Sequence, residues 1–320
     1  MKNKNGVMSV NAIIEKITEQ IQEGIYPGAS LALYRNGQWS EHYLGLADPE
    51  KGEPVVADLV YDLASVSKVV GVATICAFLY AKGELALDRP FKEVYPRFVH
   101  EKTTIRELLT HTSGLDPFIP NRDQLDARQL KTALENLQLK EDKSFHYTDV
   151  NFLLLGFWLE DRFHQPLDRL FEELIFAPWK MAETRFGPVE KAVPTVRGLA
   201  SGSVHDPKAR VLGRHAGSAG LFSTVADLER FLEHYLKEDF ARDLSQNFAR
   251  EEGKTRALGW NLEGDWLDHT GYTGTFIMYN RKRQEAVIFL SNRTYEKDER
   301  AQWILDRNSL MDLIKQECEK

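Results

Sequence analysis

Cysteine is scarce in this chain of 320 residues, and so are long hydrophobic runs and clusters of basic charge. The two cysteines, Cys76 and Cys318, cannot form a disulfide framework, which favours a reducing compartment. The longest apolar run, Val69–Ala81, is too short to span a bilayer, and polar residues at helical spacing interrupt the N-terminus where a signal peptide would be apolar. The sequence therefore predicts a cytoplasmic protein with no membrane partner.

The charge pattern excludes a second group of functions. The net charge of −7 is spread along the chain, and no basic stretch predicts binding to a nucleic acid. No two His or Cys residues have metal-ligand spacing with a third nearby, so neither a metal nor another cofactor is expected. The 42% hydrophobic and 28% charged residues are typical of a globular protein with a sizeable core, as one large domain or two smaller ones.

The first third of the chain carries clear local signals. Isoleucines recur at helical spacing between residues 13 and 25, which predicts an amphipathic helix capped by Ser9. Two strand-like runs flank Asn36-Gly37, a pair typical of a tight hairpin turn. A helix is expected to follow from Ser65, and Gly83 can end it.

The rest of the chain divides into a helical part and a strand-rich part. Residues 85–199 contain four helical patterns, whereas three strand patterns and a final helix follow residue 255. Antiparallel strands from both ends can form one sheet with both terminal helices on one face. We therefore predict an α+β fold with a discontinuous sheet domain, 1–84 and 200–320, and a helical insert, 85–199. The active site should lie in the cleft between them.

The stretch YDLASVSKVV, residues 61–70, raises the question of catalysis. If Ser65 opens a helix, Lys68 lies one turn further on the same face and its amine can reach Ser65 Oγ. A lysine desolvated among apolar residues can act as a base and activate a serine. A Ser-x-x-Lys match is expected roughly once by chance in a chain this long, and a polar cap on a core helix is the alternative. No other serine here has a lysine three residues later.

Two further elements strengthen the catalytic interpretation. Tyr147 and Asp149 precede an apolar helix, and a phenol beside an ammonium can shuttle protons. Alternatively, Asp149 caps that helix and Tyr147 packs against it. In DHTGYTGTFIMY, residues 268–279, Thr and Gly in a buried strand indicate close approach of another backbone or a ligand. As an edge strand, it could offer a free N–H to a developing oxyanion, although a glycine-rich turn at a sheet edge is the alternative.

In this order, S-x-x-K, Y-x-(N/D) and (K/H)-T-G resemble the signature of the serine β-lactamase and penicillin-binding protein superfamily. The tyrosine makes the chain similar to the class C β-lactamase-like branch, which includes esterases and D,D-peptidases. The resemblance covers nearly the whole chain and includes LLTHTSGL (108–115), AGSAGLFSTVADLERF (216–231) and AVIFLSNR (286–293). The class A deacylation glutamate motif is not apparent.

This resemblance implies a β-lactamase/transpeptidase-like fold and an acyl-enzyme mechanism. It implies Ser65 as the nucleophile, with Lys68 and Tyr147 as the proton-transfer pair. It also implies an oxyanion hole formed by the backbone N–H groups of Ser65 and Tyr272. The expected substrate is a small-molecule ester or amide, such as a β-lactam, or a D-Ala-type peptide, held by residues of the second and third motifs and of the last strand, namely Asp149, His269, Thr270, Gly271 and Arg293.

Two of these positions depart from the class C pattern. Asp149 stands where class C β-lactamases carry Asn, and its charge would hold Lys68 protonated and shift the role of base towards Tyr147. His269 replaces the lysine that holds the substrate carboxylate, and a histidine is only partly charged near neutral pH. Both changes favour neutral esters or amides. Arg293 is a candidate for the missing positive charge.

Two alternatives remain open in the sequence. Ser203, His205 and Asp206 are close together, but sequence neighbours rarely form a triad, and no G-x-S-x-G motif is present. His111 and His215 are interpreted as structural. The second alternative is a non-catalytic or very slow penicillin-recognising protein that binds peptidoglycan fragments. Intact Ser65, Lys68 and Tyr147 count against it, because binding alone needs no proton-transfer pair.

Overall fold

The computed structural model describes residues 10–250 and 254–319 of the chain. Its strands are β1 (Gly28–Arg35), β2 (Gln38–Asp48), β3 (Glu53–Pro54), β4 (Tyr61–Asp62), β5 (Arg185–Phe186), β6 (Leu221–Ser223), β7 (Asn261–Glu263), β8 (Trp266–Thr270), β9 (Phe276–Asn280) and β10 (Glu285–Ser291). Its α-helices are α1 (Val10–Gln22), α2 (Thr74–Ala81), α3 (Phe91–Val94), α4 (Ile105–Thr110), α5 (Ala127–Glu135), α6 (Val150–Phe163), α7 (Leu167–Phe171), α8 (Pro207–Leu212), α9 (Val225–Lys237) and α10 (Arg300–Cys318).

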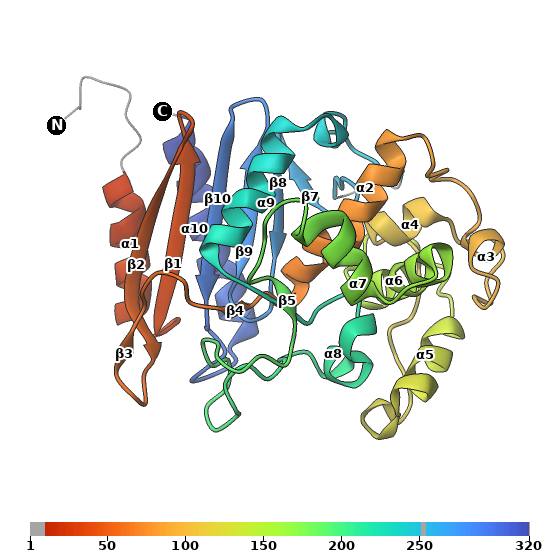
Figure 1. The fold of residues 1–320 in the computed structure, drawn as a ribbon, viewed down its shortest axis with the longest axis horizontal. Coiled ribbons are helices and arrows are strands. Elements are labelled where there is room, and N and C mark those ends of the chain that lie inside the picture. The colour runs from red at the N-terminus through yellow and green to blue at the C-terminus, as the bar shows by residue number, and fades with distance from the viewer. Residues whose placement is uncertain (1–9, 251–253, 320) are drawn as a thin grey trace.

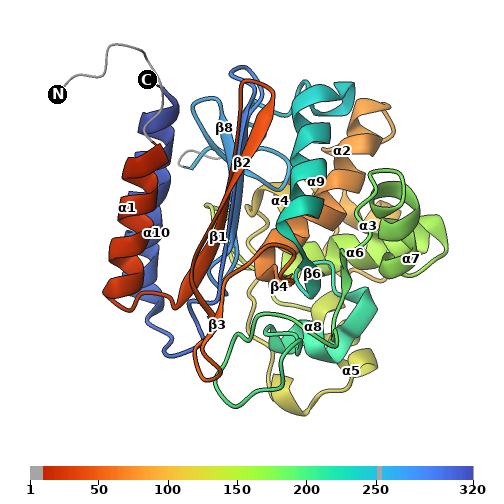
Figure 2. The same ribbon diagram turned by 60° about the vertical axis from the view of Figure 1, so that its left-hand side comes forward.

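Strands from both ends of the chain form one antiparallel sheet in the order β3-β2-β1-β10-β9-β8-β7. Helices α1 and α10 lie side by side on one face of it, and α9 covers the other face in front of α2 (Figures 1 and 2). The predicted α+β fold, with both terminal helices on one face, is confirmed. The three short strands β4, β6 and β5 form a second small sheet.

The N-terminal hairpin forms where the sequence predicts it. Strands β1 and β2 pair in register from Gly28 opposite Gly45 to Arg35 opposite Gln38. Asn36 and Gly37 connect them with φ angles of 52° and 79°, the left-handed values that a two-residue turn of this kind requires. The other edge of β1 pairs with β10, so the first and last strands of the sheet meet in its interior.

The layer formed by α1 and α10 is held by its own hydrophobic cluster. Ile13 and Ile17 of α1 and Ile314 of α10 are fully buried against strand side chains such as Leu31 and Phe289. The isoleucine spacing therefore predicts the buried face of α1 correctly. The proposed Ser9 cap lies outside the described residues.

The segment that carries Ser65 runs through the centre of the protein. It begins with a 3₁₀ turn at Ala64–Val66, continues through a π-type turn at Val69–Ala73 and ends as α2, so it is less regular than the α-helix predicted from Ser65. Gly83, with φ of 72°, follows its end as predicted. The helical stretch Ala64–Ala81 is longer than the apolar run Val69–Ala81, and its length and composition would allow it to cross a membrane. However, 78% of the stretch is buried inside the protein, as in a core helix.

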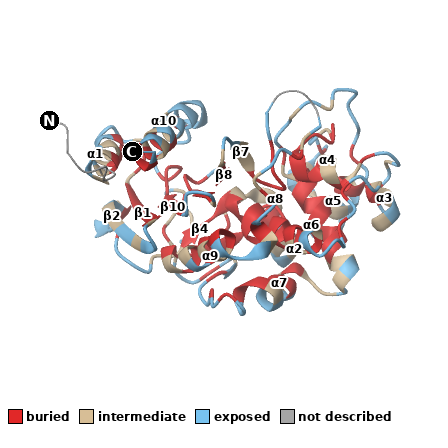
Figure 3. Cartoon of the chain, turned by 90° about the horizontal axis from the view of Figure 1, so that it is seen from above, coloured by how far each residue is buried: buried red, intermediate tan, exposed pale blue. Residues whose placement is uncertain are grey.

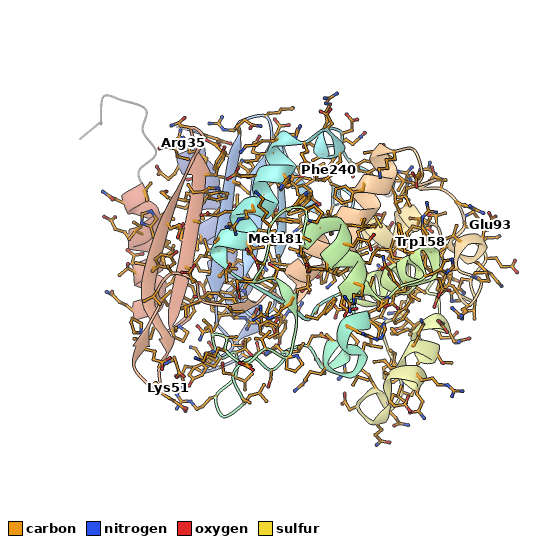
Figure 4. The ribbon with its side chains drawn as sticks, viewed as in Figure 1. Arg35, Lys51, Glu93, Trp158, Met181 and Phe240 are labelled. Atoms are coloured by element: carbon orange, nitrogen blue, oxygen red, sulfur yellow. The ribbon has the colours of Figure 1, made fainter. Side chains whose placement is uncertain are left out.

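The predicted helical region contains α3 to α7, of which α6 is almost entirely buried (Figure 3). One of the four helical patterns, residues 103–115, forms only the short helix α4, because His111 adopts a left-handed φ of 58° just after Thr110. One hydrophobic cluster extends from Ile288 of the sheet to Leu153 of α6, and side chains fill the space between these layers (Figure 4). The two predicted parts thus share a core, and their boundaries stay a prediction.

The C-terminal strands correct one expectation. Strand β8 was predicted to be an edge strand, but β7 pairs with its residues Trp266 to Asp268 and forms the edge of the sheet. Because β7 has only three residues, the end of β8 at His269 and Thr270 extends beyond it.

Gly71 offers a test of how tightly the central segment is packed. A Cβ atom there would lie 2.3 Å from Cε2 of Phe171 on α7. We expect Gly71→Ala to lower the free energy of unfolding by about 1–3 kcal/mol, because the ring must move within a packed core. Urea denaturation followed by circular dichroism measures the change. In a Phe171→Leu background the cost should shrink, and an equal cost would contradict the packing argument.

Candidate active site

Ser65 lies in a turn that buried hydrogen bonds hold in place. Ala64 has a left-handed φ of 45°, an uncommon value for a residue with a side chain, and its N–H donates to Asp62 Oδ1 over 2.8 Å. Asp62 Oδ2 accepts a second bond of 2.7 Å from the N–H of His205. Burial raises the pKa of Asp62 to about 6, although both N–H donors oppose the rise. Asp62 therefore links the Ser65 turn to the segment before α8, a role that the sequence did not indicate.

Lys68 is fully buried, and its ammonium meets three acceptors. Its Nζ donates to Ser65 Oγ over 2.9 Å, to Asp149 Oδ1 over 2.7 Å and to the carbonyl oxygen of Ser218 over 2.9 Å. Burial by itself would lower the pKa of Lys68, but Asp149 and Tyr147 outweigh it and raise this pKa above its usual value. Three acceptors match the three hydrogens of an ammonium. Lys68 is thus a cation here, not the neutral base that desolvation alone suggested.

The carbonyl of Ser218 reaches Lys68 because its loop packs closely against the core. A Cβ atom on Gly217 would lie 2.3 Å from the carbonyl oxygen of Phe152 in α6, so only glycine fits at this point. Ser67 Oγ accepts a bond of 3.1 Å from the N–H of Leu221, which ties the loop to the Ser65 helix. The sequence of this stretch, 216–231, resembles the family but does not indicate the role of its backbone.

Asp149 lies between two lysines at the start of α6. Its Oδ1 faces Lys68, and its Oδ2 lies 3.1 Å from Nζ of Lys208 on α8. Burial would raise the pKa of Asp149, but Lys68 and Lys208 hold it well below its usual range. Asp149 makes no side-chain cap to α6, so its position serves the ion pairs instead. Lys208 is a site residue that the sequence analysis missed, because it is distant from all three motifs.

Tyr147 and Lys68 come together as predicted. The ring centroid of Tyr147 lies 5.1 Å from Lys68 Nζ. The ring packs against His111 at a centroid distance of 4.6 Å, and His111 Nδ1 in turn accepts a bond of 3.4 Å from the N–H of Thr148. Burial holds the pKa of His111 well below its usual value, so this ring is neutral. His111 therefore supports Tyr147, which agrees with the structural role expected for it.

The loop after β8 packs directly against the Ser65 turn. A Cβ atom on Gly271 would lie 2.6 Å from the carbonyl oxygen of Leu63, the close backbone approach that this glycine predicts. Thr273 and Thr275 donate to the carbonyls of Asp62 and Leu63 over 2.9 and 3.1 Å. No hydrogen bond from the N–H of Tyr272 to any described residue is present. The Tyr272 N–H is therefore available near Ser65.

His269 is buried beside this loop and is uncharged. Its Nδ1 lies 3.1 Å from the carbonyl oxygen of Thr270, and its buried Nε2 has no hydrogen-bond partner among the described residues. Burial, then the charges of Lys68 and Arg256, hold the pKa of His269 well below its usual value. The expectation of a partly charged anchor at this position is wrong, because burial favours the neutral ring.

Ser65 lies between two cavities of about 540 Å³ and 200 Å³, and Tyr147, Tyr272 and Arg300 also line both. The larger contains charges of both signs, including Asp149, Asp206 and Lys208. The smaller is lined by His269, Thr270, Gly271 and four cations, Lys254, Arg293, Arg300 and Arg307, but by no carboxylate. We call this smaller cavity the cationic pocket.

The positive charges of the cationic pocket are only partly paired with carboxylates of the described residues. Arg293 is buried and pairs with Asp298. Its Nε donates to the carbonyl of Tyr272 over 2.8 Å, whereas its buried Nη2 has no hydrogen-bond partner among the described residues. Within residues 10–250 and 254–319, neither Arg300 nor Arg307 forms an ion pair. Of these cations only Arg293 belongs to a stretch that resembles the family, so the sequence did not indicate the others.

The rival Ser203–His205–Asp206 triad finds no support. Asp206 Oδ1 accepts from the N–H of Ala209 over 2.8 Å and caps α8, while the His205 ring packs on Tyr272 at a centroid distance of 5.5 Å. His215 pairs with Glu160 over 2.5 Å and lines neither cavity, in line with a structural role. The described residues contain no group of three or more His, Cys, Asp or Glu side chains that could hold a metal ion.

Known proteins resemble this chain over nearly its whole length. A protein of Escherichia coli (strain K12) named "Putative D-alanyl-D-alanine carboxypeptidase" is 26% identical, over 90% of this chain and 83% of its own. The crystal structure titled as a β-lactamase/D-alanine carboxypeptidase from Pseudomonas syringae has a TM-score of 0.74 at 20% identity and covers 94% of this chain and 98% of its own. A class C β-lactamase from Rhodobacter sphaeroides has a TM-score of 0.71 at 21% identity, over 95% and 99%.

The two structural matches show a β-lactamase/transpeptidase-like fold, which confirms the predicted fold class and the likeness to class C enzymes. The family model described as Beta-lactamase matches residues 13–310. Since that match covers most of the sequence, this chain belongs to the β-lactamase family of serine hydrolases.

Proposed function

We propose that this protein cleaves an ester or amide bond through an acyl-enzyme on Ser65. The observation that carries the proposal is the 2.9 Å hydrogen bond from Lys68 Nζ to Ser65 Oγ, at a point between two cavities. Because the ammonium donates this bond, the hydroxyl hydrogen of Ser65 is left for a base. The same ammonium stabilises negative charge that develops on Oγ during attack.

Tyr147 is the proton acceptor in this mechanism. Lys68 is already protonated, so the Ser65 proton passes to the oxygen of Tyr147 in its phenolate form, which becomes a neutral phenol as Oγ attacks the carbonyl carbon. The carbonyl oxygen becomes an oxyanion, which accepts hydrogen bonds from the N–H groups of Ser65 and Tyr272. When the bond to the leaving group breaks, Tyr147 returns the proton to the departing alcohol or amine. A water molecule repeats the sequence on the acyl-enzyme and releases the acid.

The substrate class follows from the cationic pocket. Lys254, Arg300 and Arg307 line it without carboxylate partners among the described residues, and Arg293 presents an unpaired Nη2. Such a pocket favours a substrate with a free carboxylate on one side of the reacting carbonyl. This proposal revises the preference for neutral substrates that Asp149 and His269 together led us to expect. A D-alanyl-D-alanine-type peptide, as in the name of the Escherichia coli relative, has this feature.

Covalent adduct formation tests the acyl-enzyme directly. The wild-type protein should form a transient Ser65 adduct with a short p-nitrophenyl ester and turn the ester over. Ser65→Ala should retain its fold but form no adduct. Time-resolved mass spectrometry of the intact protein measures both. Turnover that survives in Ser65→Ala would refute the mechanism, whereas an adduct that never hydrolyses would support the slow penicillin-recognising alternative.

Removal of the Tyr147 hydroxyl tests the assignment of the base. Tyr147→Phe keeps the ring contact with His111 and should reduce the acylation rate by about two to four orders of magnitude, the usual contribution of general base catalysis. Stopped-flow measurement of p-nitrophenol release gives the rate. Phe145→Leu, a change in the neighbouring wall of the cationic pocket, is the control and should have a much smaller effect. A Tyr147→Phe rate near that of wild type would exclude Tyr147 as the base.

Charge removal in the cationic pocket tests the substrate class. For a peptide ending in D-Ala-D-Ala, we compare kcat/KM of the free acid with that of its C-terminal amide. Arg307→Gln should reduce the acid-to-amide ratio about ten- to hundredfold, because a charge-assisted hydrogen bond is worth about 1.5–3 kcal/mol. The exposed Arg242→Gln is the matched control and should keep the ratio. An unchanged ratio in Arg307→Gln would show that Arg307 does not recognise the carboxylate.

A further inference from the structure

Lys208 is a charged group in the wall of the larger cavity that the mechanism above leaves without a role. Its Nζ lies 3.1 Å from Asp149 Oδ2 and 3.8 Å from Asp206 Oδ2, and its side chain is only 14% exposed. Asp206 also caps α8 through Oδ1, so the helix that carries Lys208 is fixed relative to it. Lys208 is thus held in place beside Asp149, unlike a mobile surface lysine.

The charge of Lys208 matters because Asp149 stands where class C β-lactamases carry a neutral Asn. A carboxylate 2.7 Å from Lys68 Nζ cancels the positive charge that Ser65 and Tyr147 would otherwise experience. Lys208 binds the other oxygen of the same carboxylate. Lys68, Asp149 and Lys208 together then carry one net positive charge, as Lys68 would carry beside an asparagine.

We propose that Lys208 is a positioning residue that restores the net positive charge beside Ser65 and so makes Asp149 compatible with acylation. This inference rests on the proposed function and adds to it the reason why this chain can use an aspartate at that point. Lys208 does not touch the reacting atoms. It acts through Asp149, because it forms an ion pair with the carboxylate that would otherwise pair with Lys68 alone.

The other titratable groups around Lys68 do not duplicate this role. Burial keeps His111 and His269 neutral through a lowered pKa, so neither supplies charge. Arg256 is a fully buried cation that interacts with Tyr147 rather than with Asp149, and it donates to the carbonyl of Gly259 over 3.1 Å. The groups that face the three-charge cluster are therefore Ser65, Tyr147, Asp206, His111, His269 and Arg256.

Charge removal by paired substitutions provides the test. Lys208→Met removes the cation and should reduce the rate of Ser65 acylation by a p-nitrophenyl ester about tenfold, because the site loses a charge that stabilises the transition state. Adding Asp149→Asn to this variant restores one net positive charge. The double variant should recover to within about threefold of the wild type, although it has lost both members of the ion pair.

The pH dependence supplies a second readout that a purely structural role would not change. In Asp149→Asn, Lys68 and Lys208 repel each other without an intervening anion, which lowers the pKa of Lys68. Removal of Lys208 from this variant takes away the repulsion and raises the pKa again. The acylation rate falls at alkaline pH as Lys68 loses its proton. The midpoint of this fall should therefore lie about one pH unit higher in the double variant than in Asp149→Asn.

Two controls and one substitute variant distinguish failure of this inference from failure of the proposed function. Lys208→Arg keeps the charge and should retain the rate within about threefold, and Lys282→Met, at an exposed lysine outside both cavities, should match the wild type. If Lys208→Met does not fold, Lys208→Gln replaces it. The inference on Lys208 would be overturned if the double variant were acylated no faster than Lys208→Met. It would also be overturned if the acylation rate fell at the same alkaline pH in Asp149→Asn and in the double variant. Neither result would contradict the proposed function. Loss of Ser65-dependent acylation in the wild type would instead mean that the proposed function has failed.

Discussion

The buried ammonium of Lys68 is the constraint on which the site depends. A cation that is fully removed from water is tolerated only where each of its hydrogens finds an acceptor. Here the three acceptors come from three different segments: Ser65 on the same helix, Asp149 at the start of α6, and the Ser218 carbonyl before β6. Burial of one side chain therefore fixes the relative positions of three parts of the chain that meet at Ser65.

Close backbone packing provides the precision that this arrangement needs. Gly217 lets the Ser218 loop approach α6, and Gly271 lets the loop after β8 approach the Ser65 turn. Ala64, directly before Ser65, has an uncommon left-handed backbone conformation, and Asp62 holds it there by accepting a bond from its N–H. Strained backbone of this kind persists only where the surroundings determine it strongly, and it is concentrated at functional sites.

The distribution of charge divides the site into two sides. On one side of Ser65, Asp149 and Asp206 balance nearby cations in the larger cavity. On the other side, the cationic pocket has four basic side chains and no carboxylate in its lining. The neutral His269 lies at the position where the related motif has a lysine, and the arginines that follow β10 and lie on α10 provide the charge in its place. Positive charge therefore lies beside Ser65 even though the motif lysine is replaced.

The sequence by itself determined the local features. Three-residue spacing on a helix brings Lys68 to Ser65, Asn36-Gly37 requires left-handed turn angles, and isoleucine periodicity selects the buried face of α1, because each depends on neighbours only a few residues apart. Only the tertiary structure decided the charge states and the partners. The neutral form of His269 depends on burial, and the contact of Asp149 with Lys208 joins residues 59 positions apart, as the two residue numbers show. Such long-range contacts leave no periodicity in the sequence, since the packing of entire helices and loops creates them.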